Sequence, residues 1–411
     1  MGPTGLLTAT IEIADPIVMI TLLLMVAKIF GYMATRVNQP KILGEIMAGV
    51  LLGPSIMNII APNQLLETLG ELGIFFFMFL IGFRINLKQF IQLGKHAIGV
   101  AIAGIIIPLC LGAWLASSIG MHPIVALLFG ISLSVTAVAV SADILVEFNM
   151  LEKFAGRMIL EAGVFSDIIG LFALSFLIAV AQAGEAIGGS IFSGFLLLVA
   201  KIVGFFVILT IVGVVAVPRL VDTFENSRTG FFSFVTIFIL LLAILSRISG
   251  LSGIIGTFLG GMIIRYALLR HKEVVGHQIY EEFEALSLGL LTPLFFIWVG
   301  VLVNISVLST APVLFILVLA IAVVGKIAGC GIAVKAMKRD WKDALTVGIG
   351  MNGRGEVELV VASLCRRLGF FDETIFSIVV LMALATTFMT PILLEIVLKK
   401  HPEAIPAIEP V

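Results

Sequence analysis

The chain has 411 residues, of which 60% are hydrophobic and only 12% are charged, and its mean hydropathy is +1.20. A soluble globular domain carries about 25% charged residues, so this composition excludes a soluble protein and indicates many membrane-spanning helices. The formal net charge of −1 also argues against a nucleic-acid partner, because no basic face is large enough to collect phosphates.

Apolar runs of membrane-crossing length predict an all-α polytopic membrane protein with thirteen spans. The spans lie at 16–35, 41–57, 68–84, 94–119, 123–148, 154–182, 189–217, 230–247, 251–269, 284–304, 312–337, 342–367 and 374–398. Residues 1–15 lack the basic start of a signal peptide, and we expect them to form an extracellular tail before a transmembrane domain at 16–398. A short cytoplasmic tail, 399–411, follows the last span.

The positions of lysine and arginine predict the orientation of the chain. Eighteen of the 25 basic residues lie at connections after odd-numbered spans or in the C-terminal tail, and three lie at the other connections. Cytoplasmic loops of membrane proteins carry the excess of positive charge. The N-terminus is therefore expected outside the membrane and the C-terminus inside.

The three cysteines and five histidines lack the spacing of a zinc site or of a disulfide framework. We therefore expect neither a transition metal nor a cofactor. An intramembrane aspartyl protease would need two aspartates that face each other, whereas Asp143 and Asp167 lie at different depths in their spans. The sequence predicts that the protein is not an enzyme.

Two blocks of the sequence recur. Residues 42–53, ILGEIMAGVLLG, align without gaps on 254–265, IIGTFLGGMIIR, and residues 77–87, FMFLIGFRINL, align on 295–305, FFIWVGVLVNI. The copies lie seven spans apart, and this odd number makes them run in opposite directions. Inverted repeats are typical of alternating-access transporters, whose site lies at the repeat interface near the bilayer midplane. Spans one to six and eight to thirteen form the repeats, and 189–217 is the linker.

The repeat makes spans five and twelve counterparts, and both are irregular. Span five contains SVTAVAVSAD and span twelve contains GIGMNGRGEVE. Glycines and charges in a membrane helix expose backbone groups, which cost several kcal/mol each unless they line a cavity or face protein. Two interrupted helices in matching positions of a repeat predict crossed, discontinuous helices at an ion site.

Asp167 stands in the middle of span six, in the stretch LEAGVFSDIIGLFALSFL at 160–177. A charge at the bilayer centre costs about 2.5–3.5 kcal/mol even on the lenient insertion scale, which favours a functional role. A carboxylate in a partly wet pocket holds either a proton or a small cation, and competition between the two couples their gradients. The hydroxyl of Ser166 and carbonyls freed in span five offer further oxygen ligands for a hard cation. The alternative is a buried ion pair with Lys326 or Arg354 that only holds helices together.

Lys326, Arg354 and Thr136 lie at a depth similar to that of Asp167. Lys326 can shed its proton when buried, so it either handles protons, neutralises the end of a broken helix or pairs with a carboxylate. Arg354 keeps its charge at any workable pH, and Glu356 and Glu358 lie close to it in sequence, so a structural ion pair explains it at least as well. We group Lys326, Arg354 and Glu356 as supporting charges.

Two further acidic residues lie toward the cytoplasmic side of the site. Glu161 is a supporting charge six residues from Asp167 and off its helical face, which favours a packing or funnel role over ligation. Asp143, at the inner end of span five, either lines an acidic vestibule or is an ordinary interfacial charge.

Taken together, these stretches resemble the monovalent cation/proton antiporter superfamily, in particular the prokaryotic Na+/H+ exchangers of its second branch, the NapA type. The matching segments cover nearly the whole chain, and the more specific are SVTAVAVSADIL, LEAGVFSDIIGL, GKIAGCGIAVKA and MNGRGEVELVVA. The resemblance implies a homodimer in the prokaryotic inner membrane, with a dimerisation domain and a mobile core domain that moves like an elevator. It also implies that Asp167 is the ion-binding carboxylate, Thr136 the threonine of the unwound helix and Lys326 the lysine of the second repeat.

Position 166 departs from the family pattern. Electrogenic members carry two adjacent aspartates and pair the first with that lysine, whereas Ser166 stands at this position here. With one carboxylate left to titrate, we expect electroneutral exchange of Na+ or Li+ for H+. The alternatives left open are K+/H+ antiport on the same fold and sodium-coupled symport of an organic anion, which also uses crossed helices.

Overall fold

The structure is a computed structural model that describes residues 16–37, 39–84, 95–136, 141–142, 144–145, 148, 150, 153–186, short stretches between 200 and 219, 227–249, 251–271 and 273–399. The longer elements in these residues are all helices, and the described part of the chain contains no β-strand. The expected all-α fold class is therefore confirmed. The N-terminal tail, the tail beyond residue 399 and most of the linker at 189–217 lie outside the described residues.

The helices follow the predicted spans closely. They are α1 Pro16–Arg36, α2 Lys41–Leu52, α3 Gln64–Arg84, α5 Lys95–Ser118, α6 Pro123–Ser132, α8 Phe154–Ala186, α11 Arg228–Ile248, α12 Gly253–His271, α13 Glu273–Leu286, η2 Ser287–Leu291, α14 Thr292–Val301, α15 Val307–Thr310, α16 Pro312–Ala336, α17 Trp341–Gly350, α18 Glu356–Arg367 and α19 Glu373–Lys399. Eight of the described helices are long and apolar enough to cross a membrane. This supports a polytopic membrane protein, while the count of thirteen spans stays a prediction.

Two boundaries differ from the expected spans. The span expected at 41–57 ends as a helix at Leu52, because Gly53 and Pro54 follow and proline disfavours helical geometry in the residue before it. The span expected at 284–304 starts earlier, since α13 continues into α14 through the five-residue π-helix η2. Neither shift moves a candidate site residue.

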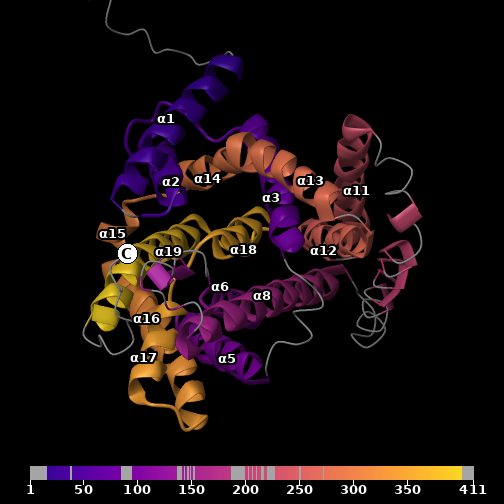
Figure 1. Cartoon of the computed structure of the whole chain (residues 1–411). Helices are drawn as coiled ribbons and strands as arrows, with labels where there is room; N and C mark the ends of the chain where they lie inside the picture. Colours follow the sequence, from indigo (N-terminus) through magenta and orange to yellow (C-terminus); the bar gives the residue numbers. More distant parts are fainter. Residues whose placement is uncertain are drawn as a thin grey trace, which may run out of the picture.

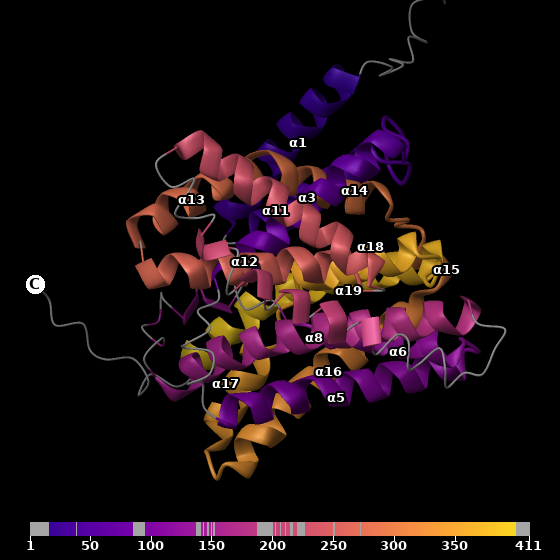
Figure 2. The same ribbon diagram turned by 90° about the vertical axis from the view of Figure 1, so that its right-hand side faces the viewer.

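The helices pack as two bundles, which Figures 1 and 2 show from two sides. One bundle, here called the scaffold, contains α1, α2, α3, α11, α12, α13 and α14; the other, here called the core, contains α5, α6, α8, α16, α17, α18 and α19. Most helix contacts lie within a bundle, and α12 against α8 is a direct contact between the two. The short α15 connects α14 of the scaffold to α16 of the core.

Close helix crossings recur in the pattern of the sequence repeat. Gly49 of α2 lies against Gly300 of α14, and Gly261 of α12 lies against Gly82 of α3. The aligned blocks match Gly49 to Gly261 and Gly82 to Gly300, so one crossing is the counterpart of the other. A Cβ atom at any of these four positions would meet the backbone of the neighbouring helix. The glycines shared by the two copies are therefore the ones that close packing requires.

The correspondence continues in the core. Gly130 of α6 lies against the carbonyl of Leu109 in α5, and Gly348 of α17 lies against the carbonyl of Ile327 in α16. Both partners of the second contact lie 218 residues after those of the first, from 130 to 348 and from 109 to 327. These contacts support the internal repeat, whereas the opposite direction of the two copies stays a prediction.

Spans five and twelve are both interrupted. The first helix of span five, α6, ends at Ser132, and residues 133–136 are not helical. In span twelve, α17 ends at Gly350 and α18 begins at Glu356, with non-helical residues 351–355 between them. The expected pair of discontinuous helices is confirmed over the described residues.

The two interruptions lie against each other. Ser141 Oγ, in span five, donates a hydrogen bond to the carbonyl of Gly350 at 2.6 Å. Arg354 Nη1, in span twelve, donates to the carbonyl of Val135 at 3.4 Å. Backbone groups that no longer bond within a helix therefore find partners in the other interruption, as a low-dielectric surrounding requires.

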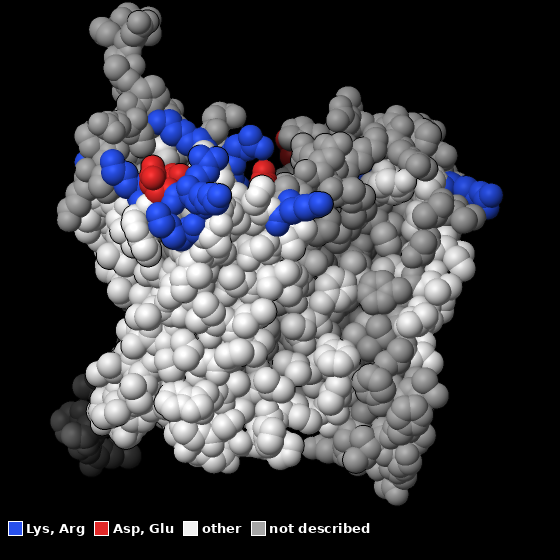
Figure 3. Space-filling view, turned by 90° about the horizontal axis from the view of Figure 1, so that it is seen from below, with Lys and Arg blue, Asp and Glu red and all other residues white. Residues whose placement is uncertain are grey.

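Charged residues are unevenly distributed over one face of the molecule. Figure 3, seen from the side of α5, α16 and α17, shows lysines and arginines gathered along one edge and a broad uncharged surface over the rest of the described residues on that face. The connection between α16 and α17 contains the exposed Lys338 and Arg339, and the exposed Lys342 follows in the first turn of α17. An uncharged surface of this width suits contact with lipid, and basic residues at one edge fit the expected charge asymmetry.

Candidate ion-binding site

Asp167 and Ser166 are on α8, which packs against α5, α6 and α17 within the core. Ser166 is fully buried and Asp167 is half-buried. Gly170 follows Ser166 by one helical turn on the same face, and a Cβ atom there would meet Val135 Cγ2 at 2.8 Å. The missing side chain therefore lets the interruption after α6 approach the face of α8 that carries the site.

Thr136 is the residue of this interruption that reaches the site. Its Oγ1 lies 3.2 Å from Ser166 Oγ, and both hydroxyls are buried. The structure therefore brings Thr136 and Ser166 together, and Asp167 is the next residue after Ser166 on α8. The arrangement offers hydroxyl and carboxylate oxygens, which are the ligands that hard cations prefer.

Lys326 of α16 is fully buried beside the same hydroxyls. Its Nζ lies 3.5 Å from Ser166 Oγ and donates a shorter hydrogen bond to the backbone carbonyl of Ser134. Asp167 also acts on this ammonium group electrostatically. The ammonium therefore stabilises a carbonyl that the end of α6 has left without a helical partner.

Arg354 is fully buried and joins three elements. Its Nη2 donates to the carbonyl of Ala322 in α16 at 3.1 Å, and its Nη1 reaches Val135 as described above. Its own carbonyl accepts a hydrogen bond from Thr387 in α19. These bonds support the expectation of a structural role for this guanidinium.

The buried carboxylate beside Arg354 is that of Glu358. Its Oε1 lies 3.8 Å from Arg354 Nη1, and both side chains are fully buried. Arg354 belongs to the non-helical segment before α18 and Glu358 to the first turn of α18, so the pair fixes the interruption to the helix that follows it. Glu356, which we grouped with the supporting charges, is the first residue of α18, and its side chain lies outside the described part.

Of the two remaining candidates, Glu161 and Asp143, only Glu161 is among the described residues. Glu161 forms an ion pair with Arg157 at 3.6 Å one turn along α8, in agreement with a packing role. Asp143 lies outside the described residues, so its expected place in a vestibule stays a prediction.

The structure adds polar residues that the sequence expectations did not include in the site. Ser134 Oγ donates to the carbonyls of Ile105 and Gly130 at 3.0 and 2.7 Å. Asn352 Nδ2 donates to Thr390 Oγ1 at 3.3 Å. The offset of 218 residues matches Ser134 to Asn352, so extending the repeat into the interruptions would have indicated both.

Comparison with known proteins shows the same architecture elsewhere. The family model for the transmembrane sodium/hydrogen exchanger matches residues 21–400. The chain is 27% identical over 379 residues to the Na(+)/H(+)-K(+) antiporter GerN of Bacillus cereus, covering 92% of this chain and 94% of that protein. It is 29% identical over 382 residues to a Na(+)/H(+) antiporter of Enterococcus hirae, covering 92% and 97%.

A plant protein and a solved structure are also similar to this chain. Cation/H(+) antiporter 18 of Arabidopsis thaliana is 30% identical over 394 residues, which cover 91% of this chain and 48% of the plant protein. The sodium proton antiporter MjNhaP1 of Methanocaldococcus jannaschii has a TM-score of 0.66 at 17% identity, over 95% of this chain and 99% of that one. A family match across nearly the whole chain, on a fold with two interrupted helices beside a half-buried aspartate, makes this protein a member of the transmembrane sodium/hydrogen exchanger family of cation/proton antiporters.

Proposed function

We propose that this protein exchanges Na+ or Li+ for H+ by alternating access, that the exchange is electroneutral, and that Asp167 binds either the cation or the proton. The surroundings of position 166 carry this proposal. A serine stands there, and the nearby Lys326 ammonium hydrogen-bonds a backbone carbonyl and this hydroxyl. One carboxylate, that of Asp167, is then the group that changes occupancy during transport.

The oxygen atoms around Asp167 suit an alkali cation. A carboxylate supplies the negative charge, and the hydroxyls of Ser166 and Thr136 supply neutral oxygen ligands. When a proton occupies the carboxylate, its charge is neutralised and the cation loses its main ligand. Mutually exclusive occupancy couples the two ions, because the core changes between its outward-open and inward-open states only with a cation or a proton bound.

The division into two bundles supports alternating access. The site, its supporting charges and both interrupted helices belong to the core, so that bundle would carry the ion while the scaffold stays in place. A scaffold that does not move is also the natural contact for a second subunit, and we propose a homodimer in a prokaryotic inner membrane. The N-terminus would lie outside and the C-terminus inside.

The proposal is tested by the cation-dependent collapse of an imposed pH gradient in proteoliposomes. Na+ and Li+ should dissipate the gradient with the wild-type protein and fail to do so with Asp167→Asn, whose amide neither titrates nor carries charge. Glu161→Gln is the matched control on the same helix, because Glu161 pairs with Arg157, and it should keep the activity. Normal exchange by Asp167→Asn would refute the site.

K+/H+ exchange is the second candidate, since one similar protein is named a Na(+)/H(+)-K(+) antiporter. Repeating the assay with each alkali ion separates the two, because the preferred ion collapses the gradient at the lowest concentration. Symport of an organic anion would instead require an organic solute for Na+ movement, which the same vesicles can test.

A further inference from the structure

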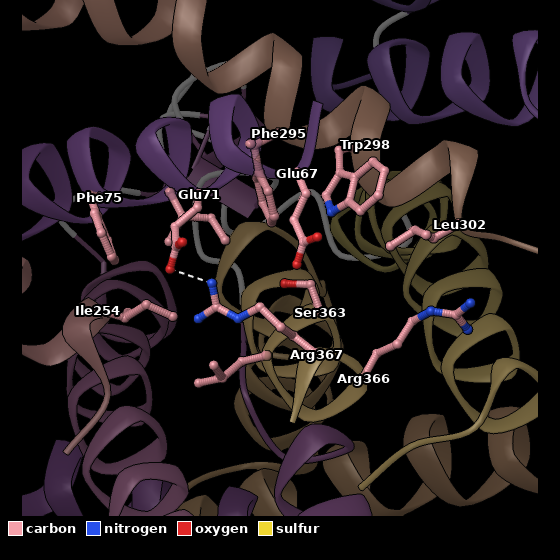
Figure 4. Close-up of a pocket in the computed structure, with 13 residues that line it drawn as sticks. Glu67, Glu71, Phe75, Ile254, Phe295, Trp298, Leu302, Ser363, Arg366 and Arg367 are labelled. Atoms are coloured by element: carbon pink, nitrogen blue, oxygen red, sulfur yellow. Dashed lines mark hydrogen bonds and ion pairs between the residues drawn. The ribbon is translucent and has the colours of Figure 1, made fainter. Parts of the chain in front are cut away.

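A pocket of about 180 Å³ lies between the two bundles, and none of the candidate ion-site residues lines it. Residues of α3, α12 and α14 form the scaffold wall, and residues of α18 form the core wall. Figure 4 shows Glu67 and Glu71 extending from α3 toward Ser363 and Arg367 of α18. The pocket therefore lies at a junction that any relative motion of the bundles has to change.

Glu71 connects two arginines across this junction. Its Oε1 pairs with Arg367 of the core and with Arg247, at the end of α11 in the scaffold. The side chain of Glu71 is 24% exposed, compared with 33% for Arg367 and 45% for Arg247, so the carboxylate is the most enclosed of the three groups. Partial burial reduces screening by water and strengthens both pairs relative to a surface ion pair.

The two arginines repel each other, and the carboxylate of Glu71 offsets this repulsion. Arg247 and Arg367 are close enough to interact electrostatically, and Glu67 adds a longer-range attraction to Arg367. Removing the charge of Glu71 would leave like charges on opposite sides of the junction. A single carboxylate thus converts a contact that would push the bundles apart into one that holds them together.

Buried apolar packing continues from the pocket toward the ion site. Ile74 and Phe295 of the pocket wall belong to the same buried apolar cluster as Val135, the residue before Thr136. Packed apolar side chains oppose the passage of a hydrated ion. A path from the pocket to the ion site would therefore require some of these side chains to move apart.

We propose that Glu71 is the gate residue of an access route that leads from this pocket to the ion site. The route opens when the Glu71–Arg367 pair breaks while Glu71 stays paired with Arg247. The inference rests on the proposed alternating-access function. Movement of the core carries Arg367 away on α18, whereas Glu71 and Arg247 remain together in the scaffold. The gate therefore breaks one ion pair and keeps its carboxylate neutralised in both states.

Thiol labelling in detergent tests the gate without requiring transport. Ser363→Cys, in a protein whose Cys110, Cys330 and Cys365 are replaced, places a reactive group in the core wall of the pocket. Glu71→Gln should raise the labelling rate by about fivefold or more, because the remaining arginines repel each other. Glu67→Gln is the matched control one helical turn away and should label like the parent protein. Equal rates for Glu71→Gln and Glu67→Gln would overturn the proposal.

Charge exchange separates electrostatic gating from general loosening of the fold. Glu71→Arg combined with Arg367→Glu restores one carboxylate between two guanidinium groups, so labelling should return to the parent rate. Glu71→Arg alone places three guanidinium groups together and should label fastest. Failure of the double variant to restore slow labelling would contradict the gate.

Cross-linking tests whether the contact has to break during transport. A bifunctional thiol reagent joining Glu71→Cys to Arg367→Cys links the two bundles and should abolish exchange in proteoliposomes. The same reagent joining Glu71→Cys to Arg247→Cys stays within the scaffold and should leave the exchange rate of that variant as it was before cross-linking. An unchanged rate after the first cross-link would refute the gate, whereas absence of exchange by the wild-type protein would refute the proposed function instead.

Discussion

Ser166 lies between a lysine and a threonine, and Asp167 follows it directly in the chain. Its hydroxyl contacts Thr136 Oγ1 at 3.2 Å and Lys326 Nζ at 3.5 Å. A hydroxyl satisfies both neighbours without adding a charge that titrates. Under the proposed function, the identity of this one side chain would set the number of charges that the site exchanges.

Ser166→Asp should make transport electrogenic. A carboxylate this close to the Lys326 ammonium forms an ion pair, and it gives the site a second group that releases a proton when a cation binds. Transport driven by a Na+ gradient would then generate a membrane potential, measured with a voltage-sensitive dye in proteoliposomes. Ser166→Ala lacks the carboxylate and should generate no membrane potential, and neither should the wild-type protein. A potential with the wild-type protein would refute electroneutral exchange.

Thr136→Val should weaken cation binding while leaving turnover largely intact. Valine keeps the shape of threonine but removes one oxygen ligand and the contact with Ser166, so the apparent KM for Na+ should rise about threefold to tenfold. The matched control is Ser132→Ala, because Ser132 Oγ donates to Phe129 of its own helix at 2.7 Å. The site assignment fails if both variants keep the wild-type KM.

The interrupted helices depend on partners from other elements. The carbonyls of Ser134 and Val135 accept hydrogen bonds from Lys326 and Arg354, so the cations of α16 and of span twelve replace bonds that a continuous helix would make. Arg354 also has the buried Glu358 within 3.8 Å. Breaking such a pair by removing one partner leaves an uncompensated buried charge, which costs about 3–5 kcal/mol.

Gly348→Ala should destabilise the packing of α17 on α16. A Cβ atom at Gly348 would lie 2.7 Å from the carbonyl oxygen of Ile327, whereas one at Gly331 would have its nearest neighbour, Ala344 O, at 3.4 Å. Overpacking costs about 1–3 kcal/mol, which outweighs the gain of about 1 kcal/mol in helix propensity. Thermal denaturation in detergent should show a lower midpoint for Gly348→Ala and an unchanged or higher one for Gly331→Ala. Equal midpoints would contradict the close crossing.

At the scale of the whole molecule, two helix bundles meet at a charged junction, and the described α15 connects one to the other. The core carries every described candidate ion ligand, and the scaffold forms the other wall of the pocket at Glu71. Within each bundle, glycines bring helix backbones together, so each bundle is suited to move as a unit. This separation of a rigid support from a mobile carrier is the physical basis of the proposed transport cycle.

The orientation of the molecule can be tested with two exposed positions. Gln64 begins α3, and Lys342, the second residue of α17, adjoins the basic connection that follows α16. In a cysteine-free background, Gln64→Cys should react with a membrane-impermeant thiol reagent on intact cells, and Lys342→Cys only after permeabilisation, because basic connections stay in the cytoplasm. Reaction of both from one side would overturn the expected topology and the inverted direction of the repeats.

Much of the fold follows from local properties of the sequence. Long apolar runs require helices in lipid because no water satisfies the backbone there, and glycine-rich or charged interruptions mark where such helices break. Asp167 stands out in the sequence because a carboxylate within an apolar run has few explanations other than function, and its role as ion ligand stays a prediction. Thr136 and Lys326 followed from resemblance and depth and Ser166 from its place next to Asp167, and the structure brings these three together.

The tertiary structure decided which groups pair. Sequence alone offered Glu356 and Glu358 for Arg354, and it offered a carboxylate for Lys326, whose ammonium instead bonds the carbonyl of Ser134. Glu71 and Arg367 are 296 positions apart, so no local pattern relates them. Composition and periodicity determine which segments become helices because those are short-range properties. The carbonyl or carboxylate that a buried lysine or arginine contacts depends instead on tertiary packing, because packing brings together groups that lie far apart in the sequence.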